Sequence, residues 1–214
     1  MRILIVDDHN IVREGLRSLI AQQPDMEVVG QAADGRTAIR LTRECKPDIV
    51  LMDISMPDMN GIEATRKIVA SRKKTKVVCL SMHAESGFIV AALQAGAAGY
   101  ILKNTAAEEL IKALRTVRDN NVYLSAPITG AVLDNYAGRQ KKSALKASAT
   151  SLSNREREIL QLLAEGKATK EIAGILGVSV PTVHTHRQHI MAKLRVQSVA
   201  ELTRYALRTG LTTL

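Results

Sequence analysis

Short apolar runs alternate with amphipathic stretches throughout residues 1–120, and this alternation limits the possible folds more than any other feature of the chain. Five runs have the length and composition of β-strands: Ile3–Asp7, Glu27–Gln31, Ile49–Asp53, Val77–Ser81 and Gly99–Leu102. The first, third and fourth runs are apolar on both faces, which is typical of strands buried in a parallel sheet. The stretches between the runs carry apolar residues at helical spacing, and Ile11, Leu16 and Leu19 form one such stripe.

Strict alternation of strands and helices predicts a parallel sheet that is covered by helices on both faces. The expected fold is therefore a doubly wound, flavodoxin-like α/β domain with five parallel strands in the order 2-1-3-4-5. In such a domain the functional site lies at the carboxyl ends of the strands.

The pattern changes after residue 120. Residues 127–136 could form one short helix, and residues 138–150 are polar and basic, as a linker is. From Ser151 onward the pattern is wholly helical, with predicted helices at about 154–166, 169–176, 180–194 and 198–209. We therefore expect a domain in residues 1–120, a linker in 121–150 and an all-α four-helix domain in 151–214.

Charge and composition narrow the function classes. The chain has 30 basic and 21 acidic residues, and its net charge of +9 is divided as +2 in residues 1–120, +3 in 121–150 and +4 in 151–214. A basic carboxyl-terminal part suits a polyanion partner, although solvated lysines alone would give the same excess. The apolar start of the chain is too short for a signal peptide or a membrane span, so we expect a cytoplasmic protein without a membrane partner.

Polar residues follow the ends of four predicted strands. Asp7 and Asp8 end the first, Asp53 ends the third, Ser81 ends the fourth and Lys103 follows the fifth. Because these ends share one edge of a parallel sheet, the five side chains should converge on one site. Three carboxylates repel one another unless a cation neutralises them, and oxygen ligands favour Mg²⁺. A carboxylate nucleophile, a hydroxyl and a lysine beside Mg²⁺ would hold a phosphoryl group.

Four segments of this domain resemble the signature blocks of receiver domains: Val6–His9, Leu51–Gly61, Leu80–Ser81 and Gly96–Lys103. The resemblance implies that a sensor histidine kinase phosphorylates Asp53, and that Ser81 and Lys103 contact the phosphoryl oxygens. It also implies that Asp7, Asp8, Asp53 and the Ser55 backbone carbonyl bind Mg²⁺. Tyr100 matches the aromatic switch position of that family; its place in a strand by itself predicts only a half-buried ring.

The helical tail has the pattern of a helix-turn-helix. Leu176–Ser179 forms the short turn, and the helix that follows should bury Val183, Ile190 and Leu194 on one stripe. Its other face carries side chains that can contact phosphates and base edges, with Arg187 at the margin. These are His184, Thr185, Gln188 and Lys193. A small helical interaction bundle would show the same pattern.

Three segments, Leu152–Leu160, Lys170–Ala173 and Val178–Leu194, resemble DNA-binding domains of the LuxR/NarL/FixJ type. The resemblance makes 180–194 the recognition helix, with His184, Thr185 and Gln188 toward the major groove and Arg187 and Lys170 near phosphates. We expect DNA contacts from Thr182 and Lys193 as well.

This chain departs from the LuxR/NarL/FixJ pattern at two positions, with His184 where lysine is common and Val199 where arginine is common. The fourth helix is the usual dimer surface in that family. Its candidates for dimer contacts are Val199, Leu202, Tyr205 and Ala206, although core packing explains them equally well.

Both resemblances together predict a response regulator transcription factor of the two-component type, not an enzyme. Phosphorylation of Asp53 would control homodimerisation and sequence-specific binding to double-stranded DNA. One alternative is a signalling adaptor whose helical tail binds protein or RNA. A second is a phosphatase-like enzyme with an aspartyl nucleophile, which is disfavoured because Ser55 stands two residues after Asp53, where a second acid would be needed.

Overall fold

The computed structural model describes residues 1–126, 128–129 and 152–212. The chain divides into two compact units, Met1–Leu133 and Asp134–Leu214, which are described separately below. The predicted linker at 138–150 lies outside the described residues, as does most of the short helix predicted at 127–136. Among the described residues, no helix is both long enough and apolar enough to cross a membrane.

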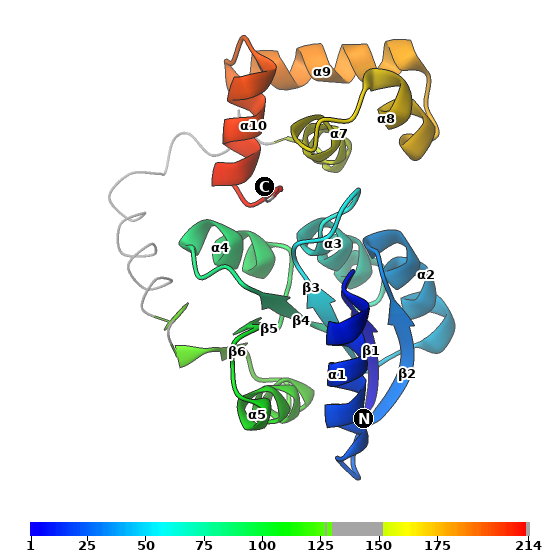
Figure 1. The fold of residues 1–214 in the computed structure, drawn as a ribbon, viewed down its shortest axis with the longest axis vertical. Coiled ribbons are helices and arrows are strands. Elements are labelled where there is room, and N and C mark those ends of the chain that lie inside the picture. Colours follow the sequence, from blue (N-terminus) through cyan, green and yellow to red (C-terminus); the bar gives the residue numbers. More distant parts are fainter. Residues whose placement is uncertain (127, 130–151, 213–214) are drawn as a thin grey trace. The chain divides into compact units, whose positions relative to one another are not determined.

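The first unit is built on a parallel sheet with the strand order β2-β1-β3-β4-β5-β6 (Figure 1). Its strands are β1 (Arg2–Val6), β2 (Glu27–Ala32), β3 (Ile49–Asp53), β4 (Lys76–Ser81), β5 (Gly99–Leu102) and β6 (Tyr123–Leu124). The five predicted strands and their order are confirmed. The sixth strand was not predicted, because two residues are too few to show an alternating pattern. It pairs with Gly99 and Tyr100 and extends the sheet beyond residue 120.

Five helices cover the two faces of this sheet. They are α1 (Asn10–Ala21), α2 (Gly35–Cys45), α3 (Gly61–Ser71), α4 (Ser86–Gln94) and α5 (Ala107–Arg118). Helices α1 and α5 pack on one face, where Ile3 and Ile5 meet Ile20 and Leu114, and α2, α3 and α4 cover the other (Figure 1). One predicted stripe residue does not join the core, because Ile11 is 83% exposed.

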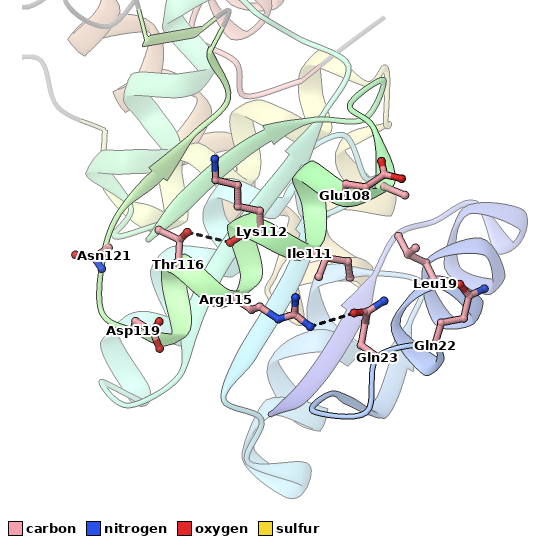
Figure 2. Close-up of a pocket in the computed structure, with 11 residues that line it drawn as sticks. Leu19, Gln22, Gln23, Glu108, Ile111, Lys112, Arg115, Thr116, Asp119 and Asn121 are labelled. Atoms are coloured by element: carbon pink, nitrogen blue, oxygen red, sulfur yellow. Dashed lines mark hydrogen bonds between the residues drawn. The ribbon is translucent and has the colours of Figure 1, made fainter.

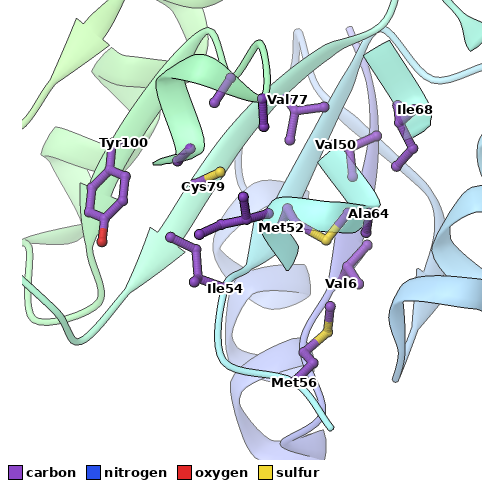
Figure 3. Close-up of a cluster of buried hydrophobic side chains, with 14 of the residues drawn as sticks. Val6, Val50, Met52, Ile54, Met56, Ala64, Ile68, Val77, Cys79 and Tyr100 are labelled. Atoms are coloured by element: carbon purple, nitrogen blue, oxygen red, sulfur yellow. The ribbon is translucent and has the colours of Figure 1, made fainter. Parts of the chain in front are cut away.

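The core on the α2–α3–α4 face is rich in methionine and small aliphatic side chains. Figure 3 shows Val50, Met52 and Val77 from neighbouring strands packed with Ala64 and Ile68 of α3. With few aromatic residues in the chain, unbranched methionines fill the irregular gaps between layers. Tight packing beneath β3 and β4 fixes the carboxyl ends of these strands, where the polar residues lie.

The second unit contains four helices, α7 (Asn154–Ala164), α8 (Thr169–Leu176), α9 (Val180–Leu194) and α10 (Val199–Arg208). The predicted capping box at Ser153 and Glu156 is confirmed, and Ser179 caps α9 through the Thr182 N–H. Gly177 ends α8 in the left-handed region at φ 63°, which glycine adopts without a steric penalty.

The four helices share one core, which includes Ile159, Leu163, Ile172, Val183 and Ile190. The predicted buried stripe of α9 is therefore correct for Val183 and Ile190, whereas Leu194 is half-buried and packs at the edge of the core. The short turn between α8 and α9 gives the helix-turn-helix arrangement that the sequence predicts.

Candidate functional site

The carboxyl edge of the sheet carries a compact acidic site. Asp7 and Asp8 follow β1, Asp53 is the last residue of β3 and Lys103 follows β5. The Lys103 Nζ lies 2.7 Å from Asp7 Oδ2 and 2.9 Å from Asp53 Oδ2. Both carboxylates are buried, with Asp7 at 0% and Asp53 at 1% exposure. The structure thus brings together residues that are far apart in the sequence.

Burial and charge oppose each other at Asp53. Burial raises the pKa of its carboxyl to about 6, although the ion pair with Lys103 lowers it. At Lys103 burial lowers the pKa, but Asp7 and Asp53 outweigh it, so the net shift is upward. The charged Lys103 ammonium therefore faces the Asp53 carboxyl, whose ionised form is destabilised by burial. An additional cation at this site would stabilise that ionised form.

His9 joins the acidic site although no role was predicted for it. Its Nδ1 lies 2.8 Å from Asp8 Oδ1 and 3.4 Å from Asp7 Oδ1. One ligand atom each from Asp7, Asp8, His9 and Asp53 lies within 4.8 Å of the others, a spacing that can hold a metal ion. The sequence signal that could have indicated this role for His9 is its position directly after Asp7 and Asp8.

Gly61 and Ser55 support Asp53 from the loop after β3. The Ser55 N–H donates to Asp53 Oδ1 at 3.2 Å, and the Gly61 N–H donates to the Ile54 carbonyl at 3.0 Å. A Cβ at Gly61 would lie 1.9 Å from the Asp53 carbonyl oxygen and 2.9 Å from Met52 Cγ. Only glycine therefore allows α3 to begin directly against the strand that carries Asp53.

The predicted hydroxyl and aromatic residues meet at the backbone of His83. Ser81 Oγ accepts the His83 N–H at 3.0 Å, and the Tyr100 hydroxyl donates to the His83 carbonyl at 2.8 Å. Ser81 also lies beside Lys103, whose backbone N–H donates to the Ser81 carbonyl at 2.8 Å. The expectation of a half-buried Tyr100 is wrong: the residue is 0% exposed, because β4 and β6 flank its strand and its ring joins the core under α4 (Figure 3).

A separate hollow of about 590 Å³ lies between α1 and α5 (Figure 2). Leu19 and Ile111 line it, and Arg115 donates to Gln23 Oε1 at 3.0 Å and to Asp25 Oδ1 at 2.9 Å. None of the acidic-site residues lines this hollow. Its polar groups hold α5 to the loop after α1, so it does not extend the acidic site.

The predicted DNA contacts divide into exposed and engaged side chains. His184, Thr185 and Gln188 of α9 are exposed, as is Lys170 near the start of α8, and Arg187 is half-buried. Two of the predicted residues also serve the local fold.

The Thr185 hydroxyl donates to the Pro181 carbonyl at 3.1 Å, and Thr182 contacts the capping residue Ser179 through both its N–H and its hydroxyl. The outward face of α9 is therefore polar and open around His184 and Gln188.

Lys193 makes an ion pair within the second unit. Its Nζ lies 2.8 Å from Glu156 Oε2, which joins the end of α9 to the start of α7. Burial alone would raise the pKa of Glu156, but the bonds from Lys193 and Ser153 outweigh it and lower that pKa. Sequence reasoning placed Lys193 on the outward face and did not identify this partner.

The candidates for a dimer surface on α10 separate in the same way. Leu202 and Ala206 are fully buried in the core, Tyr205 is half-buried and Val199 is 37% exposed. Core packing thus accounts for Leu202 and Ala206 and leaves Val199 and part of Tyr205 on the surface.

Family comparisons agree with this architecture. Residues 3–115 match the family model described as "Response regulator receiver domain", and residues 150–206 match "Bacterial regulatory proteins, luxR family". The chain therefore belongs to the response regulators that join a receiver domain to a LuxR-family DNA-binding domain, and it is a transcription regulator.

Among its relatives, the chain is similar to the oxygen regulatory protein NreC of Staphylococcus aureus (strain bovine RF122 / ET3-1). The two are 42% identical over 214 residues, which cover 99% of each chain. A LuxR-family two-component response regulator from Aurantimonas sp. SI85-9A1 is 40% identical, with a TM-score of 0.61 over 64% of this chain and 97% of that one. RcsB of Salmonella enterica serovar Typhimurium, bound to the promoter rprA in the presence of phosphomimetic BeF3−, is 27% identical. Its TM-score is 0.63, over 96% of this chain and 97% of that one.

Proposed function

We propose that Asp53 accepts a phosphoryl group from a phosphohistidine of a sensor histidine kinase. The observation that carries this proposal is the buried Asp53 carboxylate at the end of a central strand, ion-paired with Lys103. In the transfer the P–N bond of the phosphohistidine breaks and a P–O bond to Asp53 forms. Lys103 would then contact one phosphoryl oxygen, and the Ser81 hydroxyl would donate a hydrogen bond to another phosphoryl oxygen.

A magnesium ion suits the charges of this site. Asp7, Asp8 and Asp53 bring three negative charges, and Lys103 returns one positive charge, so an excess remains that a divalent cation can neutralise. Carboxylate oxygens are ligands that Mg²⁺ prefers. We assign Asp7, Asp8, Asp53 and the Ser55 backbone carbonyl as its ligands. The ion would neutralise charge on the transferring phosphoryl group.

The second unit is proposed to bind double-stranded DNA with α9 in the major groove. Exposed His184, Thr185 and Gln188 would meet base edges and phosphates, with Thr182, Arg187 and Lys170 at the margins. Lys193 was predicted for the same role, although its ion pair with Glu156 competes with it. RcsB bound to a promoter with a phosphomimetic supports the assignment for a chain of this architecture.

Phosphorylation is proposed to control homodimerisation and thereby affinity for paired half-sites. We propose further that the chain acts by binding and does not turn over a substrate. Residues 121–150 would link the receiver to a DNA-binding domain in 151–214. Because its partners would be a kinase phosphohistidine and DNA, we place its action in the cytoplasm.

The test is phosphorylation of the full chain by a small phosphodonor with and without Mg²⁺. We expect one acid-labile, hydroxylamine-sensitive phosphoryl group, and none on Asp53→Asn. Asp48→Asn is a matched control, because Asp48 is exposed at the opposite edge of the sheet. Undiminished labelling of Asp53→Asn would refute the assignment. Asp8→Asn should weaken the dependence on Mg²⁺.

A further inference from the structure

The basic residues of the receiver are segregated. Residues 64–76 contain six basic residues and no acidic one, whereas the rest of residues 1–120 contains 11 basic and 15 acidic residues. The receiver thus combines a cationic segment with an otherwise net acidic domain. Neither the acidic site nor the helix-turn-helix uses this segment.

The fold places the end of this segment, residues 72–76, at the amino edge of the sheet, opposite the acidic site. Arg72 caps the end of α3, and the following turn leads into β4 at Lys76. The Thr75 hydroxyl donates to the Pro47 carbonyl at 2.9 Å, and the Lys76 N–H donates to the Asp48 carbonyl at 2.9 Å. These bonds fix the turn against the start of β3.

Two further cations join the segment at this edge. Lys46 ends α2 directly before Pro47, and the Asp48 N–H donates to the Arg2 carbonyl at 2.9 Å. The amino-edge cluster comprises Arg2, Lys46, Arg72, Lys73, Lys74 and Lys76.

Four of the six cations of the amino-edge cluster are available to a partner. Arg2, Lys46, Lys73 and Lys74 are exposed, and in the part of the chain that the structure describes no member of the cluster makes an ion pair. The Arg72 Nε is buried and has no hydrogen-bond partner among the described residues. The carboxyl-terminal ends of helices attract cations, which accounts for Lys46 and Arg72 but not for the lysines that follow.

The surroundings of the cluster favour a polyanion over an apolar partner. The large exposed hydrophobic residues of the described chain are Ile11, Met82, Val122, Val180 and Val199, and none is a member of the cluster. Val122 precedes β6 at the same edge, but β5 separates β6 from β4, the last strand of the cluster. A membrane or a protein partner would be expected to use apolar anchors as well as charge. The phosphate backbone of a duplex requires only closely spaced cations.

We propose that the amino-edge cluster of the receiver is a second contact surface for the DNA backbone. The proposal rests on the proposed DNA binding of the second unit and adds a sequence-independent contribution from the first. Neighbouring strands lie about 4.8 Å apart, so the ends of β1, β3 and β4 span about 10 Å. A DNA strand presents one phosphate per roughly 3.4 Å of axis, so the edge can meet about three phosphates.

The experiment measures binding of the full chain to a duplex that extends well beyond the bound site, over a range of salt concentrations. The test variant is Lys73→Gln/Lys74→Gln, which removes two exposed, unpaired charges. The control, Arg36→Gln/Lys112→Gln, removes two exposed charges from other faces of the receiver. Thermal unfolding checks that both variants keep the wild-type fold.

We expect the slope of log affinity against log salt to become shallower by about 1.8 in the test variant and to stay unchanged in the control, because each lost phosphate contact removes about 0.9. Equal slopes for the wild type and both variants would overturn this inference while leaving the helix-turn-helix as a DNA reader. Absence of DNA binding by the wild-type chain would instead refute the proposed function. Binding of the wild type to anionic phospholipid vesicles, lost in the test variant with no change in the DNA slope, would identify a membrane surface and overturn the proposal.

Discussion

Lys193 offers the sharpest test, because sequence and structure assign it different tasks. In the structure its ammonium lies 2.8 Å from Glu156 Oε2 and joins α9 to α7. The Glu156 side chain is 5% exposed and also accepts the Ser153 N–H at 2.7 Å. Lys193→Met would keep most of the aliphatic stem and leave the Glu156 carboxylate with one partner fewer.

The expected loss of stability is about 1 kcal/mol. A hydrogen bond to a charged group contributes about 1.5–3 kcal/mol, but the Lys193 side chain is 40% exposed, and solvent screening reduces such pairs toward about 1 kcal/mol. Amide hydrogen exchange of the full chain, read by mass spectrometry, should therefore show roughly fivefold faster exchange in α7 and α9, since each 1.4 kcal/mol is about tenfold. Peptides from α1–α5 serve as the internal control, and Lys193→Arg should restore most of the protection.

The pH dependence gives the same test a sign. Because the pKa of Glu156 is lowered from its ordinary value of 4.5, its pair contributes stability above about pH 4.5 and loses it as pH falls through the folded-state pKa. The difference between wild type and Lys193→Met should shrink in that acidic window. The reasoning is refuted if exchange is unchanged in the variant while the salt slope of DNA binding drops by about 0.9, since Lys193 would then be a phosphate contact.

Three other predictions have defined outcomes. Gly61→Ala should destabilise the receiver by about 3 kcal/mol and impair phosphorylation, because the added Cβ would overlap the Asp53 carbonyl. Gly15→Ala is the control: no atom lies within 4 Å of its added Cβ, so it should stabilise the receiver by about 0.5–1 kcal/mol. Equal melting temperatures for the two variants would contradict this. With a chelator present, the wild-type receiver should lose stability as pH rises from 3.8 through about 6, because the raised pKa of Asp53 makes its ionisation costly in the folded state. Asp53→Asn should remove that loss. A difference in melting temperature between wild type and Asp53→Asn that stays constant with pH would oppose the prediction. His184→Lys, at an exposed position on α9, should steepen the salt slope of DNA binding by about 0.9, and an unchanged slope would show that no phosphate lies there.

The main elements of the fold are readable from the sequence because each one has a strong local signal. The limits of β3, β5, α8 and α9 agree with the predicted ones, since apolar runs and caps such as Ser179 mark them. The sixth strand has no such signal, because it forms only where β5 offers a free edge. Ile11 shows the opposite error: it was predicted to lie on a buried helix stripe but is exposed, since an apolar residue at the border of such a stripe can still face solvent.

The acidic site was predictable in part for a topological reason. Parallel strands bring their carboxyl ends to one edge, so residue type and strand position were enough to place Asp7, Asp53 and Lys103 together. Pairings between helices carry no comparable rule. Lys193 and Glu156 are 37 positions apart on two amphipathic helices, and only the packing of α7 against α9 decides that they meet.

Ser81 and Tyr100 show a further limit of residue-based prediction, because the peptide groups on either side of His83 connect them. The Tyr100 hydroxyl donates to the His83 carbonyl, and the His83 N–H donates to Ser81 Oγ. Both side chains therefore contact the backbone of His83, and neither of these bonds involves its imidazole. That imidazole instead stacks on Phe88, with ring centroids 4.5 Å apart. A movement of the Ser81 hydroxyl toward Asp53 would draw on the same short backbone segment that holds the Tyr100 hydroxyl. This coupling between Ser81 and Tyr100 depends on backbone geometry, so many side chains at position 83 would allow it. Proline would not, because it lacks the N–H. The identity of residue 83 therefore says little about whether the coupling exists.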